Sequence, residues 1–175
     1  MVTVLPALHD DVIVLTGYTC PDMPVHPAEA NGQTAHRFGR RPKTAAPATI
    51  SDPFARWADE WETGGSTRAF VARQRDTGRL LGGCELHIQP RGSARVCYWI
   101  SPADRGYGYA TRSLVLLLRY ARTIGIRQAK AHIAANNHAS RRVAEKAGLL
   151  SVTAFTAEDG TGMVQYLINL AHSSY

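Results

Sequence analysis

The sequence predicts one mixed α/β domain, in which a central sheet is flanked by helices. Three observations lead to this fold class. The chain has 175 residues, which suits a single domain because domains commonly hold ~100–150 residues. From Arg68 onward, strand-like segments follow one another across short turns, as antiparallel strands do. Further along, strand-like and helix-like segments alternate, which indicates a mixed sheet.

The first 65 residues predict few regular elements, because prolines interrupt them repeatedly (Pro6, Pro21, Pro24, Pro27, Pro42, Pro47 and Pro53). Residues 12–18 have a strand pattern, and residues 27–36 predict a short helix. Residues 53–63 predict a second helix, which Gly64 would end. Acidic side chains surround Trp57 and Trp61 on that helix, a pattern that fits a receptor for a cationic amine or a solvated face over buried aromatics.

The middle of the chain predicts three strands and a helix. Strands at residues 68–75 and 80–89 are joined by the turn Asp76-Thr77-Gly78-Arg79, and a third strand covers residues 96–100. Residues 111–124 predict a helix with one broad apolar face packed on the sheet. We expect that face to contain Leu114, Val115, Leu117, Leu118, Ala121 and Ile124.

The last part of the chain continues the alternation. Residues 128–134 predict a strand, and residues 139–147 a helix that Gly148 stops. Closing strands are expected at residues 153–155 and 163–170. In such mixed sheets, ligands bind at the carboxyl ends of strands where neighbouring strands separate.

The turn between the third strand and the helix is the strongest candidate for a binding site. It reads Arg105-Gly106-Tyr107-Gly108-Tyr109-Ala110. Two glycines spaced by one residue allow positive φ and close approach of a ligand, and the helix N-terminus favours an anion. A tight turn without a ligand would have the same pattern. Because no lysine follows the glycines, the sequence lacks the phosphate loop of nucleotide hydrolases, and the glycine spacing is too short for a dinucleotide fold.

Composition limits the remaining functional classes. The net charge is +6, from 20 Lys and Arg against 14 Asp and Glu. The high arginine content fits phosphate recognition, and it fits a compositional bias of the source genome equally. Because the arginines are dispersed, nucleic-acid binding is not expected. Three cysteines (Cys20, Cys84 and Cys97) have no metal-ligand spacing and are expected to be reduced, and no metal site is expected. Without a leader pattern or an apolar span, a cytoplasmic protein with no membrane contact is expected.

Several motifs together resemble the GNAT superfamily of acetyl-CoA-dependent N-acetyltransferases. They are Tyr98-Trp99-Ile100, the turn at residues 105–110, Asn137-His138-Ala139-Ser140, and Val143-Ala-Glu-Lys-Ala-Gly148. The chain is most similar to the Rim-type branch, which acetylates ribosomal-protein N-termini, and the resemblance extends from about Phe70 to Leu150.

The resemblance implies a mostly antiparallel sheet with splayed strands and a site for acetyl-CoA. The pyrophosphate would bind the backbone amides of Arg105, Gly106, Tyr107, Gly108, Tyr109 and Ala110. The strand at residues 96–100 would separate from the strand at 128–134, and the pantetheine arm would enter the gap. Backbone groups near Trp99 and Ile100 would pair with that arm, and those near Ile100 would also stabilise the oxyanion.

Asn137 and Ser140 precede and open the last expected helix. In the resembling branch the matching Asn contacts pantetheine, and the matching Ser lies near the CoA sulfur and can protonate the leaving thiolate. Many other GNAT branches use a tyrosine of this helix as the acid, and this helix has none. Asn137 would serve equally as a helix N-cap, and Ser140 as a surface hydroxyl.

Glu85 and His87 alternate on one face of the strand at residues 80–89 and can point together toward the acceptor. The resemblance favours Glu85 as the general base, directly or through a water. The other interpretation is a structural carboxylate paired with an arginine.

The resemblance also divides the single domain, residues 1–175, by role. Residues 1–65 would shape the acceptor site, residues 66–150 would bind acetyl-CoA, and residues 151–175 would form closing strands. The expected reaction is direct attack by a primary amine, either of a small molecule such as an aminoglycoside-like antibiotic or of a protein N-terminus. A CoA-binding sensor without turnover stays an alternative. The sequence does not determine the oligomeric state, and a homodimer is one option.

Overall fold

A computed structural model describes residues 6–17 and 57–172 of the chain. The helix expected at residues 27–36, the first residues of the helix expected at 53–63, and Cys20 lie outside these residues. Where the structure describes the chain, it finds no helix that is both long enough and apolar enough to cross a membrane.

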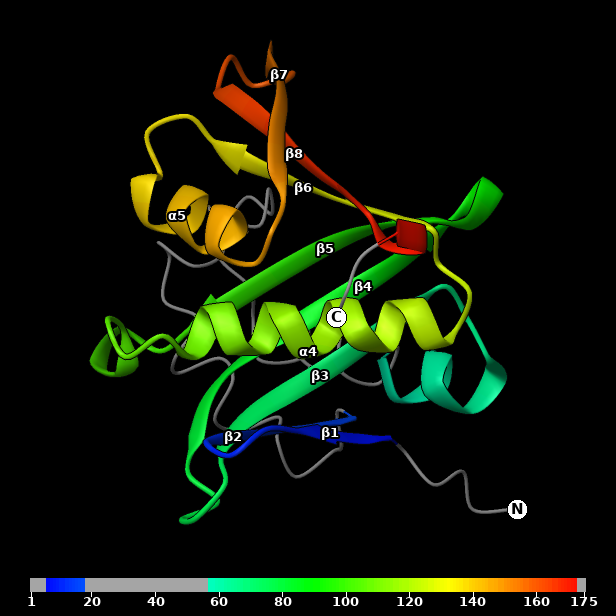
Figure 1. The fold of residues 1–175 in the computed structure, drawn as a ribbon, viewed down its shortest axis with the longest axis vertical. Helices are drawn as coiled ribbons and strands as arrows, with labels where there is room; N and C mark the ends of the chain where they lie inside the picture. The colour runs from blue at the N-terminus through cyan, green and yellow to red at the C-terminus, as the bar shows by residue number, and fades with distance from the viewer. Residues whose placement is uncertain (1–5, 18–56, 173–175) are drawn as a thin grey trace, which may run out of the picture.

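The described strands form one eight-stranded sheet in the order β1-β2-β3-β4-β5-β6-β8-β7 (Figure 1). The strands are β1 (Ala7–His9), β2 (Ile13–Gly17), β3 (Thr67–Gln74), β4 (Leu80–Gln89), β5 (Ser93–Ile100), β6 (Gln128–Ala134), β7 (Leu150–Thr156) and β8 (Gly162–Asn169). The described residues also form the helices α4 (Tyr109–Thr123) and α5 (His138–Lys146), the 3-10 helices η2 (Pro90–Gly92), η3 (Pro102–Asp104) and η4 (Leu170–His172), and a helical segment at residues 57–63. All neighbouring strands are antiparallel except β5 and β6, so the expected mixed and mostly antiparallel sheet is confirmed.

Several strand boundaries differ from the sequence prediction. The bounds of β4 and β6 agree with it, whereas β5 begins three residues earlier and β7 extends on both sides of residues 153–155. Strand β1 was not expected. Its three residues are too few to show an alternating pattern, and they become a strand because they pair with β2.

The parallel pair β5 and β6 is short. Only Ser93, Ala94 and Arg95 have partners on β6, at Gln128, Ala129 and Lys130. Beyond Arg95 the two strands separate, while β5 continues to pair with β4 as far as Ile100. The expected splay of the sheet is therefore present, and it opens toward the carboxyl ends of β5 and β6.

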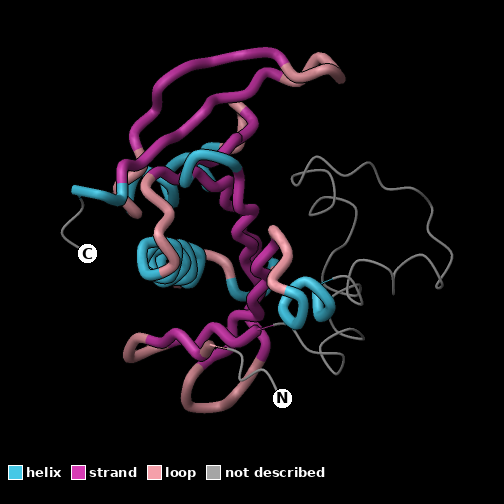
Figure 2. Tube along the Cα trace, turned by 90° about the vertical axis from the view of Figure 1, so that its right-hand side faces the viewer, coloured by secondary structure: helices cyan, strands magenta, loops and turns pink. Residues whose placement is uncertain are grey.

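Helix α4 packs on one face of the sheet, and the helix of residues 57–63 lies on the other side (Figure 2). The expected apolar face of α4 is confirmed at Leu114, Leu117, Leu118 and Ala121, each fully buried. Ile124 departs from it with 40% exposure. Ile124 is the C-cap residue with φ −95°, so it lies past the last helical turn and leaves the apolar face.

Trp61 belongs to the core. Its ring packs edge-on against Phe70 at 5.2 Å and near Tyr120 at 6.3 Å, and its Nε1 donates to the carbonyl of Ala69 at 2.9 Å. Trp57, also buried, packs with Ala69 and Val71 on the opposite face. The interpretation of these indoles as buried aromatics is therefore supported, since Trp57 is 3% and Trp61 8% exposed, and the Arg68 guanidinium already lies over the Trp61 ring at 5.2 Å.

Candidate active site

The glycine turn has the backbone that the sequence predicts. Gly106 has φ 91° and Gly108 has φ 82°, and Gly108 is the N-cap of α4, so no capping side chain covers the first N–H groups of the helix from this position. A Cβ added at either glycine would meet no atom within 4 Å. Both glycines thus border open space in front of the first N–H groups of α4, which is the shape an anion such as a pyrophosphate requires.

Two arginines fasten this turn to the sheet. The Arg105 Nε donates to the carbonyl of Ile100 at 3.2 Å, which ties the turn to the end of β5. Just before it, the buried carboxylate of Asp104 accepts a hydrogen bond from Arg79 at 2.6 Å, and Arg79 lies in the β3–β4 turn. The local sequence pattern did not predict this second contact, because it does not relate Asp104 to a residue 25 positions earlier.

The register of β4 and β5 decides which backbone groups border the gap. The Ser101 N–H donates to the carbonyl of Leu81 at 2.8 Å, so Ser101 faces β4. Because hydrogen-bonding direction alternates along an antiparallel strand, Trp99 also faces β4, whereas Tyr98 and Ile100 face the gap. By this register Tyr98 and Ile100, rather than Trp99, present backbone groups to a molecule between β5 and β6.

Asn137 and Ser140 lie at the N-terminus of α5, beside that gap. The Asn137 Oδ1 accepts from the Ser140 N–H at 3.2 Å, so Asn137 is the N-cap of α5. The Ser140 carbonyl in turn accepts a hydrogen bond from the Tyr98 hydroxyl at 2.8 Å. Burial raises the pKa of Tyr98, so this hydroxyl keeps its proton. The role of Tyr98 was not predicted, because its partner lies 42 residues away.

Glu85 and His87 point to the same side of β4, as expected. The Glu85 Oε2 and the His87 Nε2 lie 3.0 Å apart, and both side chains are mostly buried. Glu85 also lines a hollow of about 10 Å³ together with Trp57, Gly83 and Trp99. That volume approaches the space a single water requires. Among the described residues the ion-pair partner of Glu85 is a histidine, and no arginine pairs with it.

A comparison with known families decides the identity. The family model described as the acetyltransferase (GNAT) domain matches residues 15–150. The chain belongs to the GNAT family. The expectations of a GNAT fold, of an acyltransferase, and of acetyl-CoA as the acyl donor are thereby confirmed. No curated protein sequence matches the chain significantly.

Solved GNAT structures share the fold at low sequence identity. The spermidine N-acetyltransferase from Vibrio cholerae, in complex with CoA and spermine, is 17% identical with a TM-score of 0.78, over 93% of this chain and 98% of that chain. RimL, a ribosomal α-N-protein acetyltransferase in complex with coenzyme A, is 15% identical with a TM-score of 0.83, over 94% and 98%. RimJ from Mycobacterium smegmatis, in complex with a CoA disulfide, is 17% identical with a TM-score of 0.74, over 98% and 89%. The expected likeness to Rim-type proteins is thus confirmed for the fold.

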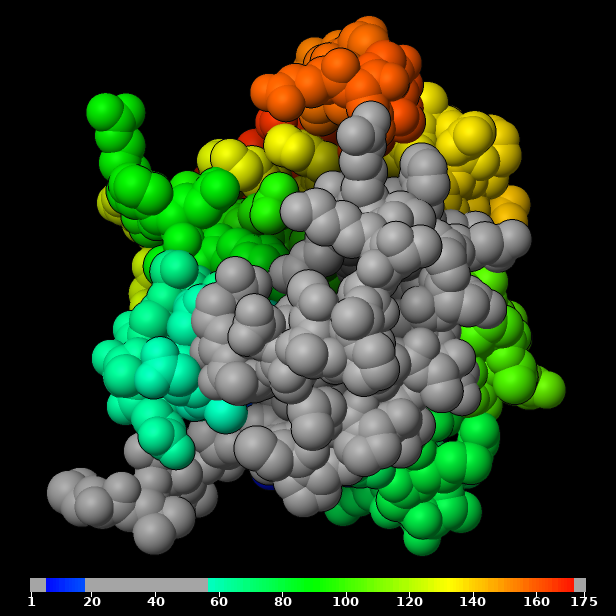
Figure 3. All heavy atoms as spheres, turned by 180° about the vertical axis from the view of Figure 1, so that it is seen from behind, coloured from blue at the N-terminus to red at the C-terminus, as the bar shows by residue number. Residues whose placement is uncertain are grey.

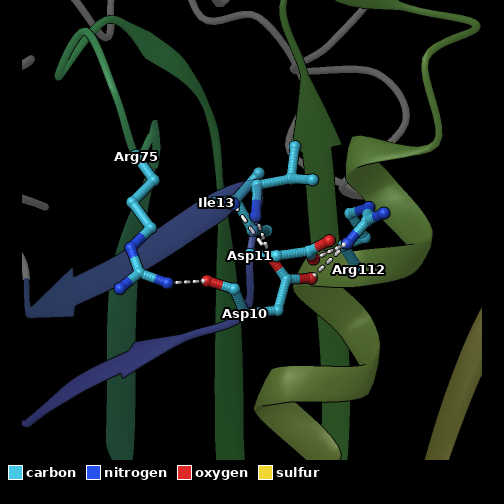
Figure 4. Close-up of polar contacts among 6 residues, drawn as sticks. Asp10, Asp11, Ile13, Arg75 and Arg112 are labelled. Atoms are coloured by element: carbon cyan, nitrogen blue, oxygen red, sulfur yellow. Dashed lines mark hydrogen bonds and ion pairs between the residues drawn. The ribbon is translucent and has the colours of Figure 1, made fainter.

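The first turn of α4 is also braced by the β1–β2 turn in this GNAT domain (Figure 4). Arg112 pairs with Asp10 at 2.8 Å and with Asp11 at 2.7 Å, both in the β1–β2 turn. The other Asp10 oxygen accepts the N–H groups of Val12 and Ile13, each at 2.8 Å. Burial opposes ionisation of Asp10, but these hydrogen bonds and Arg112 outweigh it and lower its pKa.

This brace supports the helix end that borders the glycine turn. A cation in the first helical turn is unfavourable for the helix dipole, and the two carboxylates beside Arg112 offset it. The sequence offered no sign of the contact, because Asp10 and Arg112 are 102 residues apart.

Proposed function

We propose that the protein transfers the acetyl group of acetyl-CoA to a primary amine of a small molecule or of a protein N-terminus. The amine attacks the thioester directly in a ternary complex. One observation carries the proposal: the open turn at Gly106 and Gly108 lies at the N-terminus of α4 and follows β5 after the short helix η3, at the end of the sheet where β5 and β6 have separated. A pyrophosphate site and a slot for an extended arm are thus adjacent.

The turn and the gap hold different parts of the donor. The N–H groups of residues 105–110 bind the pyrophosphate, because Arg105 and Asp104 keep the turn against the sheet while both glycines leave its surface open. The backbone of Tyr98 and Ile100 pairs with the pantetheine amides, as an added strand would. The Ile100 N–H faces the gap and stabilises the negative charge that develops on the thioester carbonyl.

The chemistry needs a neutral amine and a proton for the leaving sulfur. Glu85 accepts the amine proton, through a water in the hollow beside it, as the N–C bond forms. The C–S bond breaks, and the CoA thiolate takes the proton of the Ser140 hydroxyl, which regains a proton from solvent water. The position of Ser140 on α5 is held by Asn137 and Tyr98. An α-amino group, with a pKa of ~7.7–8.0, is partly neutral near pH 7 and depends less on a general base. A lysine amine has a pKa of ~10.4, and forming its neutral state near pH 7 costs roughly 4–5 kcal/mol.

Similar solved structures include proteins for two acceptor classes, spermidine and ribosomal-protein N-termini. Both carry primary amines, which supports the reaction type. An acceptor screen tests the proposal: the full chain is incubated with acetyl-CoA and a panel of a polyamine, an aminoglycoside and short peptides, and thiol release is followed. We expect turnover on at least one amine. Tight CoA binding without turnover on any amine would instead favour a CoA sensor.

A further inference from the structure

Two cations lie on the face of the sheet that carries Glu85. On β4 and β5, His87 is directly opposite Arg95, and on β5 and β6, Arg95 is directly opposite Lys130. Cross-strand partners share a face, and the β4–β5 register is regular from Gln89 to Gly82. His87, Arg95 and Lys130 therefore form one row on the face of the sheet away from α4. Figure 3 views the molecule from the side opposite to that of Figure 1.

This row has an excess of positive charge. In strands β3 to β8 the only carboxylate is Glu85, and its partner is His87. Within the described residues, neither Arg95 nor Lys130 forms an ion pair. Arg95 is exposed and Lys130 is half-buried. Two cations without a carboxylate beside them attract an anion and repel a second cation.

The row also lies at a defined distance from the proposed base. Glu85 is directly opposite Cys97, and Arg95 is two residues before Cys97 on the same strand. Diagonal neighbours of this kind are separated by about 7–8 Å. That distance corresponds to roughly two residues of an extended peptide. Lys130 lies one strand spacing, about 4.8 Å, beyond Arg95. An acceptor whose amine reaches Glu85 can therefore place its second or third residue beside Arg95, and an acidic side chain there extends toward Lys130.

We propose that Arg95 and Lys130 select the acceptor by binding a carboxylate close to the reacting amine. The substrate class is a peptide N-terminus with an acidic residue at its second or third position, and polyamines are disfavoured because their further charges meet the same cations. This inference rests on the proposed function, since it assumes that an amine reacts beside Glu85. It assigns Arg95 and Lys130 to specificity and gives them no part in the chemical step.

The test uses three amidated peptides of equal length that begin Ser-Asp-Glu, Ser-Gln-Gln and Ser-Lys-Lys, together with spermidine. The full chain and its variants Arg95→Gln, Lys130→Gln and Arg95→Glu are assayed for kcat/KM. Arg119→Gln is the matched control, because Arg119 is an exposed cation of α4 on the other side of the sheet. Peptide binding is also measured by isothermal titration in the presence of CoA, which requires no turnover.

We expect the acidic peptide to exceed the basic peptide and spermidine by about 10-fold or more in kcat/KM. Arg95→Gln and Lys130→Gln should each reduce the acidic peptide's kcat/KM by about 3- to 10-fold, mainly through KM, and leave the neutral peptide unchanged. Arg95→Glu should shift the preference toward the basic peptide. The preference should shrink as the salt concentration rises from about 0.1 M to about 1 M, because the Debye length falls from about 10 Å to about 3 Å.

The two proposals fail in different ways. Turnover that is equal for acidic, neutral and basic peptides, or unchanged by Arg95→Glu, overturns the assignment of Arg95 and Lys130 while the acetyltransferase function stands. Absence of turnover on every amine overturns the proposed function. In that case the titration still decides the inference, because equal binding of the acidic and basic peptides contradicts it.

Discussion

The Tyr98 hydroxyl donates a hydrogen bond to the Ser140 carbonyl at 2.8 Å and joins β5 to the N-terminus of α5. It does so where β5 and β6 no longer pair. The contact therefore holds α5 at a set distance from the strand whose backbone borders the gap. Because Asn137 caps the same helix through the Ser140 N–H, both main-chain polar groups of Ser140 have partners.

Replacing Tyr98 by Phe tests this contact. The change leaves a partly buried carbonyl without its donor, so we expect a loss of about 1–3 kcal/mol in the free energy of unfolding. We also expect a several-fold higher KM for acetyl-CoA. Tyr120→Phe is the control, since that hydroxyl is on α4 away from the gap. Denaturant unfolding and initial rates measure both effects, and an unchanged KM would argue that the contact does not set the width of the gap.

Gly108 and Gly125 provide a matched pair at the two ends of α4. Both have φ 82°, and a Cβ at either would meet no atom within 4 Å. Alanine at each position should therefore lose a similar ~1–2 kcal/mol through backbone strain. We expect Gly108→Ala alone to weaken CoA binding, by about 10-fold or more, because its Cβ enters the ligand side of the turn. Calorimetric titration with CoA measures this affinity. Equal affinity of both variants for CoA would contradict the assignment of the pyrophosphate to this turn.

Glu85→Gln tests the general base. The variant keeps the shape of the side chain but cannot accept the amine proton. We expect kcat/KM to fall more for lysine-like amines than for α-amino groups, since only the former require deprotonation by about three pKa units. Rates are measured across pH for one acceptor of each kind. A loss that is the same for both acceptors would indicate a structural role for Glu85.

Asp10→Asn tests the brace beneath α4. The folded-state pKa of Asp10 is lowered, so its stabilising contribution is present above the unfolded pKa, near ~3.9, and is lost as pH falls through the folded value. At pH 7 the wild type should therefore be more stable than the variant. The difference in the free energy of unfolding should be on the order of 1 kcal/mol or less, because the pair is partly solvated, and it should vanish in acid. Asp11→Asn should have a smaller effect, since Asp11 is 81% exposed and, among the described residues, accepts only from Arg112. Urea unfolding at several pH values measures the difference, and a constant difference across pH would exclude a role for the charge.

Local patterns predicted the elements that depend on local forces. The alternation of residues 80–89 and 128–134 gave strands with the observed bounds, because each side chain faces either the core or the opposite surface. The apolar residues of α4 were predicted because they recur at helical spacing and so face the core together. The pattern misled at Ile124, where a chain that leaves the helix exposes the side chain.

The sequence by itself determined the GNAT fold and the backbone of the glycine turn, since positive φ at Gly106 and Gly108 is a preference of the residues themselves. Only the tertiary structure decided what holds that turn in place. Asp104 meets Arg79, Arg112 meets Asp10, and Tyr98 meets Ser140 across distances of 25, 102 and 42 residues. Such contacts form when packing brings separate elements together. A short pattern of neighbouring residues therefore does not predict which distant residues will meet.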